Sequence, residues 1–341
     1  MNQLNFNFDP PQEPKPEAAP LTTAHSRPTP EQMAQQLEQH PDYRVLRRLV
    51  PNLDCGPKLG APDTSSAHAD SPWVLVLDTE TTGLSHAFDK IIELAMLLVQ
   101  VDTASGLPFG PVETFEGFED PGMLIPEVAG QITGITDEMV QGQRLNDVRV
   151  EGLLARADLV VAHNAGFDRP FVEARFPGFA SKSWACSFMD IDWKALGTPS
   201  AKLSALAQDQ GWFYDAHRAL VDCHALLQVL SCRLVGGETT GLGLLMAAAA
   251  KPIFKLRAIG APFEAKDKLK SRGYRWDAER RVWYCTLASE HLLAAETDWL
   301  KAEVYGSRRD QVEVEALDSL TRYSLRTGQV GIHPNLATPH P

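Results

Sequence analysis

The sequence predicts an α/β protein in which helices cover both faces of a mixed sheet, followed by a small α+β module. Two patterns lead to this prediction. Between residues 71 and 237, three apolar strand-like runs come first, helical and strand-like segments then alternate, and two amphipathic helices follow. From residue 251 onward, strands and helices alternate again over roughly 75 residues, a size that can fold alone with a modest core.

The larger region is expected to begin with an antiparallel meander. Its three strands are predicted at residues 74–80, 91–102 and 112–118, because these runs are largely apolar and the connections between them are short. Hydrophobic spacing then predicts helix, strand, helix, strand, helix and helix at residues 147–157, 159–163, 168–176, 183–188, 202–210 and 219–235. Pro170 is expected in the first turn of its helix, where a missing N–H is tolerated.

The first 71 residues are predicted to form a tail, then a helical segment and linker at 31–71. Residues 1–30 carry seven prolines and little hydrophobic periodicity, so they are expected to be disordered. A helix is predicted from about Thr29 to Leu49, with Pro30 near its start. Residues 51–71 are expected to form a loop.

The C-terminal module is predicted to span residues 251–327, followed by a flexible tail at 328–341. Its expected elements are strand, helix, strand, helix and strand at residues 254–259, 264–271, 281–286, 290–305 and 312–317. Between Lys251 and Arg281, ten basic residues outnumber four acids, and aromatic residues are interleaved among them. Two interpretations stay open. These residues bind single-stranded nucleic acid, or the rings form the module's own core while the lysines are solvated.

Composition excludes several classes of protein. No apolar run approaches the ~20 residues that span a bilayer, and the polar, Pro-rich N-terminus argues against a secretory signal. The five cysteines are scattered without a Cys-x-x-Cys pair, which favours reduced thiols in the cytoplasm over a zinc site or a disulfide framework. The net charge of −12 argues against a general polyanion-binding surface, but not against a nucleic-acid enzyme with local phosphate contacts.

The most informative motif is Asp78-Thr79-Glu80-Thr81-Thr82-Gly83, which follows the apolar run 73–77. Two carboxylates two residues apart on a strand share a face, because side chains alternate. Such a pair is costly to bury unless a cation lies between the two acids, and Mg²⁺ or Mn²⁺ prefers oxygen ligands. A strand end with two solvated acids would give the same pattern, so this motif alone leaves both interpretations open.

Two later motifs add candidate residues. In 161–168, a buried strand ends in a polar turn, and Asp168 follows at the start of a helix, where an acid could also be a simple cap. His217 and Asp222 are five residues apart, which is about 140° of rotation on a helix, so they would not share one helix face. His217 is therefore expected on the loop before the helix that carries Asp222.

Together these motifs resemble those of the DEDDh family of 3′→5′ exonucleases, which includes the proofreading epsilon subunit of bacterial replicative DNA polymerase. The family's three motifs are Asp-x-Glu, Asn-x-x-Phe-Asp and His-x-x-x-x-Asp. They are matched in order by Asp78 with Glu80, Asn164 with Phe167 and Asp168, and His217 with Asp222. The other branch of the family has Tyr at the position of Arg218, which favours the His branch here. The exonuclease domain would span residues 72–237.

The resemblance implies a ribonuclease H-like fold and metal-dependent hydrolysis of phosphodiesters at DNA 3′ ends, in proofreading or repair. Two Mg²⁺ or Mn²⁺ ions would be held by Asp78, Glu80, Asp168 and Asp222. His217 would take the proton from the attacking water, since imidazole exchanges protons near neutral pH. The 3′-terminal nucleotide would be held by Asn164, Thr81, Thr82, Gly83 and Leu84. Phe167 would either contact the substrate or pack in the core.

Several alternatives stay open at this point. Related enzymes with the same acids process RNA ends, so an exoribonuclease is one alternative, and a catalytically silent nucleic-acid-binding or polymerase-docking module is another. A single-stranded DNA 3′ end is the expected partner, and no membrane association is expected. The segment Gln3-Leu4-Asn5-Phe6-Asn7-Phe8 resembles short peptides that dock on bacterial sliding clamps.

Overall fold

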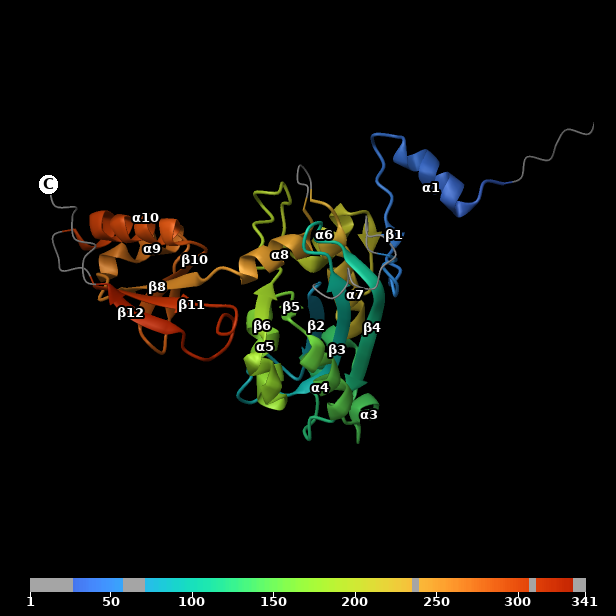
Figure 1. Ribbon diagram of the computed structural model, residues 1–341, viewed down its shortest axis with the longest axis horizontal. Coiled ribbons are helices and arrows are strands. Elements are labelled where there is room, and N and C mark those ends of the chain that lie inside the picture. Colours follow the sequence, from blue (N-terminus) through green and yellow to red (C-terminus); the bar gives the residue numbers. More distant parts are fainter. Residues whose placement is uncertain (1–26, 58–70, 235–238, 307–310, 334–341) are drawn as a thin grey trace, which may run out of the picture. The chain divides into compact units, whose positions relative to one another are not determined.

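A computed structural model describes residues 27–57, 71–234, 239–306 and 311–333 (Figure 1). The chain divides into two compact units, Met1–Val45 and Leu46–Pro341. In the first, α1 (Pro30–Glu38) begins with a capping box between Thr29 and Gln32. The predicted helix to Leu49 is wrong beyond Glu38, because Pro41 lacks an N–H and disfavours helical backbone before it. The clamp-like segment Gln3–Phe8 lies outside the described residues.

The second unit contains a five-stranded mixed sheet, as predicted, in the order β4-β3-β2-β5-β6 (Figure 1). The strands β2 (Trp73–Thr81), β3 (Ile91–Val101) and β4 (Pro108–Phe118) form the expected antiparallel meander. Next to β2, the strands β5 (Leu159–Ala162) and β6 (Ser183–Cys186) run parallel to it and to each other. This arrangement brings the ends of β2 and β5 to the same edge of the sheet.

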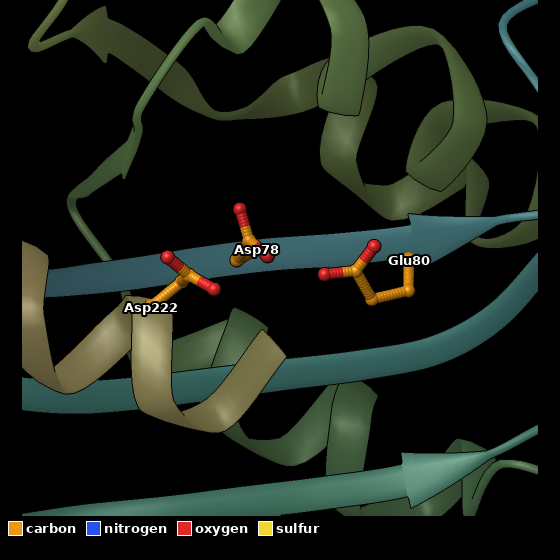
Figure 2. Close-up of side chains that lie close together, drawn as sticks. All are labelled: Asp78, Glu80 and Asp222. Carbon is orange, nitrogen blue, oxygen red and sulfur yellow. The ribbon is translucent and has the colours of Figure 1, made fainter. Parts of the chain in front are cut away.

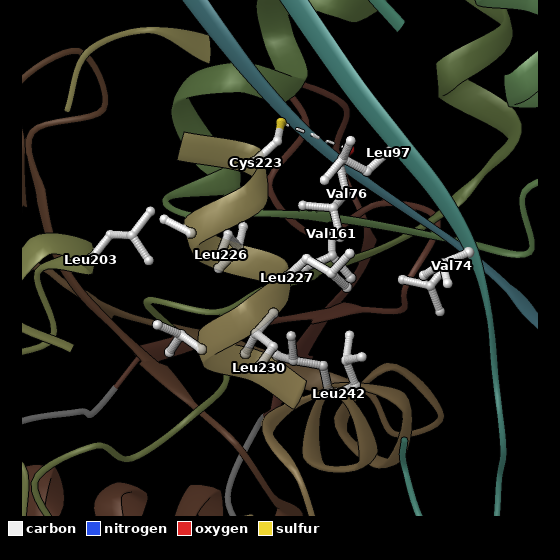
Figure 3. Close-up of a cluster of buried hydrophobic side chains, with 14 of the residues drawn as sticks. Val74, Val76, Leu97, Val161, Leu203, Cys223, Leu226, Leu227, Leu230 and Leu242 are labelled. Atoms are coloured by element: carbon white, nitrogen blue, oxygen red, sulfur yellow. Dashed lines mark hydrogen bonds between the residues drawn. The ribbon is translucent and has the colours of Figure 1, made fainter. Parts of the chain in front are cut away.

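Apolar side chains on both faces of the sheet bury it between helices. On one face, Val74 and Val76 of β2 pack with apolar residues of α6 (Leu203–Asp209), α7 (Ala219–Ser231) and α8 (Gly241–Ala249), as Figure 3 shows. On the other face, Leu75 and Leu77 pack with residues of α4 (Asp147–Arg156) and α5 (Ala165–Arg175). Because side chains alternate along β2, the even-numbered residues that follow Val76 continue the face that α7 covers.

Some elements differ from the prediction. The helix α5 begins at Ala165, three residues earlier than expected, so Pro170 lies in its second turn instead of its first. The helix α7 ends at Ser231, where Arg233 and Thr240 form a β-bridge, and α8 was not predicted. Shorter elements complete this region: α2 (Glu127–Thr133), α3 (Asp137–Val140), the 3₁₀ turn Pro177–Ser181, and the parallel pair β1 (Arg47–Arg48) and β7 (Trp212–Phe213).

The C-terminal module is a second five-stranded sheet, in the order β12-β11-β8-β10-β9. Its strands are β8 (Ile253–Ile259), β9 (Arg275–Asp277), β10 (Val282–Leu287), β11 (Gln311–Leu317) and β12 (Gln329–His333). A 3₁₀ turn (Phe263–Ala265) leads into α9 (Lys266–Ser271), and α10 (Glu290–Leu300) continues into a π-helical turn, Lys301–Tyr305. The expected flexible tail is wrong for residues 329–333, because they pair with β11; residues 334–341 lie outside the described part.

Within the described ranges, we find no helix that is long and apolar enough to cross a membrane.

Candidate active site

Three carboxylates converge at the end of β2. Asp78 and Glu80 continue the face of β2 that α7 covers, and Asp222 lies in the first turn of α7. One oxygen from each of the three lies within 4.8 Å of the others, and Figure 2 shows the carboxylates grouped between strand and helix. Their donor set is all oxygen, which suits a hard divalent cation. The structure thus brings together three of the four predicted metal ligands.

The start of α7 is held by hydrogen bonds to Asp222. Its Oδ2 accepts the N–H of His217 at 2.8 Å and the N–H of Arg218 at 3.3 Å, while Oδ1 accepts the hydroxyl of Tyr214 at 3.1 Å. His217 has left-handed backbone, with a φ of 70°, and its side chain is exposed. His217 therefore lies on the turn before the helix, as the spacing predicted.

Asp168 is the fourth predicted ligand, and it is not part of this three-oxygen group. It lies in α5 and is buried, and its Oδ1 accepts the N–H of Thr79 at 3.1 Å and the hydroxyl of Thr79 at 2.8 Å. Thr79 stands between Asp78 and Glu80 in β2. Asp168 thus holds the strand that carries the first two acids, and its negative charge helps to raise the pKa of Asp78.

The electrostatics of the cluster favour a bound cation. Burial, followed by the charges of Asp168 and Asp222, raises the pKa of Asp78 well above its usual range. Burial and the charge of Asp222 raise the pKa of Glu80 to about 8. Burial also raises the pKa of Asp168 to about 7, against its hydrogen bonds to Thr79. A bound cation would stabilise the ionised form of these carboxyl groups and lower their pKa values. The site can therefore bind a divalent metal.

Stability of the metal-free protein should therefore depend on pH. With a folded pKa of about 8 for Glu80, against about 4.3 in an unfolded chain, the folded state binds more protons between these values. Stability should fall as pH rises through this window, and saturating Mn²⁺ should restore it most near pH 8. Melting temperatures of wild type and Glu80→Gln, with and without Mn²⁺, check this. Equal pH slopes for the two metal-free proteins would contradict it.

An ion pair between buried Glu93 and partly exposed Arg218, which the sequence pattern did not predict, holds together a strand and a helix at the site. Glu93 of β3 is fully buried and lies directly opposite Glu80 in the sheet register. Its Oε1 accepts from Arg218 Nη2 at 2.7 Å, and its Oε2 accepts the N–H of Ala219 at 3.0 Å. Arg218 therefore joins β3 to the start of α7, and Glu93 caps that helix. The only sequence signal was a lone acid within the apolar run 91–99.

The loop after β2 is shaped by its own hydrogen bonds. Thr81 Oγ1 donates to the carbonyl of Gly83 at 2.6 Å, and Thr82 Oγ1 donates to Asp89 Oδ1 at 3.1 Å. A β-carbon at Gly83 would come within 2.6 Å of Asp89 Oδ2, so a larger residue would have to displace the carboxylate that accepts from Thr82 and Ser85. Leu84 is 87% exposed, which leaves its side chain available for a ligand.

Two predicted substrate contacts lie around the start of α5. Asn164 is exposed and adopts left-handed backbone with a φ of 72°, which asparagine tolerates better than most residues. Phe167 is partly buried and packs against the core on the α5 face of the sheet, with its ring 5.2 Å from that of Phe171. Its contacts favour the packing interpretation of Phe167 over the substrate one.

The acid cluster lies within a region of the chain that resembles known exonucleases. Residues 75–230 match the RNase T exonuclease family. PolC-type DNA polymerase III of Listeria monocytogenes is 35% identical over 136 residues, covering 39% of this chain and 9% of that protein. The Thermotoga maritima PolC-type polymerase is 31% identical over 205 residues, covering 55% and 14%. The chain thus spans less than a sixth of the length of these relatives.

Among solved structures, Exonuclease X in complex with 5′ overhanging duplex DNA is 25% identical with a TM-score of 0.36, and the match covers 46% of this chain and 89% of that one.

Proposed function

We infer, from the match of residues 75–230 to the exonuclease family, that this chain is a metal-dependent 3′→5′ exonuclease. Its substrate is a DNA 3′ end, from which it releases nucleotides by phosphodiester hydrolysis. The observation that carries this inference is the convergence of Asp78, Glu80 and Asp222 beside the turn that bears His217. The matched relatives are DNA polymerases, which supports DNA over RNA as the substrate.

The acids would hold Mg²⁺ or Mn²⁺ and orient the scissile phosphate. We assign Asp78, Glu80 and Asp222 as direct ligands of two ions, with Asp168 as the fourth acid of the set. When bound, such ions lower the pKa of a coordinated water and offset charge on the leaving oxygen. Asp168 also keeps β2 in place through Thr79, so that Asp78 and Glu80 present their carboxylates together.

His217 is the proposed general base. Its exposed side chain stands on the turn that Asp222 anchors. Burial raises the pKa of Asp222 and the charge of His217 lowers it, which supports a place for His217 beside the acid cluster. The base takes a proton from the attacking water, and the exposed position lets the ring pass that proton on to solvent. Asn164 and the loop of Thr81, Thr82, Gly83 and Leu84 would hold the 3′-terminal nucleotide; the exposed side chains of Asn164 and Leu84 support this role.

Replacing His217 with alanine should lower kcat by about 10²–10⁴-fold, because proton transfer to a positioned side chain contributes this much. Mn²⁺ affinity should stay close to that of wild type, because His217 contacts Asp222 through its backbone N–H, which alanine keeps. Single-turnover kinetics and calorimetry measure the two quantities. The matched control is His291→Ala, an exposed histidine of the module, which should change neither. Unchanged turnover in His217→Ala would remove this residue from the base role.

DNA and RNA oligonucleotides of one sequence distinguish the substrate classes. The proposal expects faster shortening of DNA. Faster shortening of RNA would make the chain an exoribonuclease, and no shortening of either with Mg²⁺ or Mn²⁺ would favour a silent binding module. Docking on a sliding clamp through Gln3–Phe8 and a cytoplasmic location stay predictions from the sequence alone.

A further inference from the structure

The sheet of the C-terminal module has an apolar face that packs against α9 and α10, and an opposite, polar face. We call this polar face the open face, although Arg257 and Glu315 are buried on it. Phe254, Leu256 and Ala258 of β8 belong to the module's core, together with residues of α9 and α10. The alternate residues Lys255 and Arg257 therefore lie on the other face. In the register, Tyr284 of β10 is opposite Arg257, and Arg275 of β9 is opposite Tyr284, so all four share the open face.

The open face borders a groove of about 1120 Å³ that reaches the exonuclease domain. On the far side the groove is lined by Asn164 and Gly166, at the start of the helix that carries Asp168. Lys251, two residues after the end of α8, also lines it. The groove is thus continuous with residues of the proposed active site.

The segment 318–328, between β11 and β12, ties the module to the exonuclease domain. Arg169 of α5 is fully buried and donates to the backbone carbonyls of Leu320 and Arg322, each at 2.6 Å. Arg322 is also fully buried, with its Nη1 3.5 Å from Asp190 Oδ1. Both walls of the groove therefore belong to one compact unit, Leu46–Pro341. Deleting the module would leave Arg169 without these carbonyls, so point substitutions test the groove more cleanly than truncation.

Cations of the module divide into paired and unpaired groups. Arg257 is neutralised by Glu313 and Glu315, and Arg280 lies 3.6 Å from Glu313. Within the described ranges, no ion pair joins the groove cations Lys251, Lys255 and Arg275 to a carboxylate, while the charges of Glu315 and Asp277 still act on Lys255.

The unpaired cations suit a weakly held polyanion. The ammonium of Lys255 lies over the ring of Tyr284, 4.6 Å from its centroid, so a strand that stacks a base on Tyr284 also meets this charge. Asp192 and Glu279 also line the groove. Their negative charges weaken the attraction between the groove and a polyanion, and salt should weaken it further.

We propose that this groove binds single-stranded DNA upstream of the 3′ nucleotide that is removed. The proposal rests on the proposed exonuclease function. Its basis is the continuity of the groove with Asn164, the unpaired cations Lys251 and Arg275 for phosphates, and Tyr284 as a ring on which a base can stack. The groove would let the enzyme hold a long strand while the end is cut.

The test compares the double variant Lys251→Glu/Arg275→Glu with a control of equal charge change, Lys266→Glu/Lys270→Glu. The control residues lie on α9 and do not line the groove. The measured quantity is the ratio of kcat/KM for a strand of about 20 nucleotides to that for one of about 4. This ratio should fall about tenfold in the groove variant, and the slope of log KM against log salt should drop by about 1.4, or ~0.7 per lost contact. The control should keep the wild-type ratio and slope.

The possible failures are distinguishable. If wild type shortens both strands and the groove and control variants give the same ratio, the groove proposal is overturned while the exonuclease function stands. If wild type shortens neither strand, the proposed function fails. The affinity of each variant for a labelled strand, measured by fluorescence anisotropy in EDTA, then still tests the groove. The groove proposal requires the groove variant to bind the strand more weakly than the control. Melting temperatures verify folding, and Arg275→Gln alone serves if the double variant does not fold.

Discussion

Replacing Asp78 with asparagine should abolish nuclease activity and raise the melting temperature of the metal-free protein. Asp78 is the acid whose ionised form is most opposed by burial and by its neighbours Asp168, Asp222 and Glu80. Asparagine keeps the shape but removes the charge, so the repulsion disappears along with a metal ligand. We expect kcat to fall at least about a hundredfold, and Tm to rise by about 2–4 °C for each kcal/mol of repulsion removed.

Asp298→Asn is the matched control, because Asp298 is exposed on α10 and far along the chain from the acid cluster. It should change neither activity nor Tm. Thermal melts in EDTA above pH 8, past the pKa of Glu80, give the largest difference, because more of the cluster is ionised there. A variant that loses activity and also melts lower without metal would show that Asp78 is stabilising and would contradict the electrostatic part of this account.

Replacing Arg218 with methionine should destabilise the fold and slow catalysis. A second substitution, Glu93→Gln, should restore the stability but not the activity. Removing Arg218 leaves the fully buried Glu93 carboxylate without its cation, which costs about 3 kcal/mol or more. In the double variant Glu93→Gln/Arg218→Met that charge is gone, and the N–H of Ala219 still has an oxygen acceptor. Most of the lost stability should return.

Activity should not return with stability, because the double variant no longer fastens the turn of His217 to β3. We expect kcat to stay about tenfold to a hundredfold below wild type, with little change in KM, since small misplacements of a reacting group have costs of this size. Denaturant unfolding and steady-state kinetics measure the two effects. If kcat recovers fully together with stability, Arg218 contributes to the fold alone and has no role in positioning His217.

The local pattern of apolar and polar residues predicted most strands of the sheet and the positions of the motif residues at its edge. Alternating and continuous apolar runs located β2, β3 and β4, and the alternation of β2 placed Asp78 and Glu80 on one face. The five-residue spacing of His217 and Asp222 predicted the turn before α7. The sequence also held the signal for the end of α1, since Pro41 stops a helix, although the prediction extended past it.

Features that depend on tertiary contact were not predictable. The pairing of Glu93 with Arg218 joins residues 125 positions apart and is visible only once β3 and α7 are packed. The motif of Asp168 predicted a metal ligand, which stays a prediction. Its hydrogen bonds to Thr79 follow from the parallel pairing of β2 with β5, which no local pattern fixes. Short β12 lacked a distinctive pattern and depends on pairing with β11.

The most direct test of the central claim is the product ladder from a 5′-labelled single DNA strand incubated with Mg²⁺, Mn²⁺ or EDTA. The account predicts that wild type shortens the strand from its 3′ end in one-nucleotide steps with either ion, and that EDTA or Asp78→Asn stops the reaction. A strand that stays intact with both ions, or one that is cut internally, would contradict it.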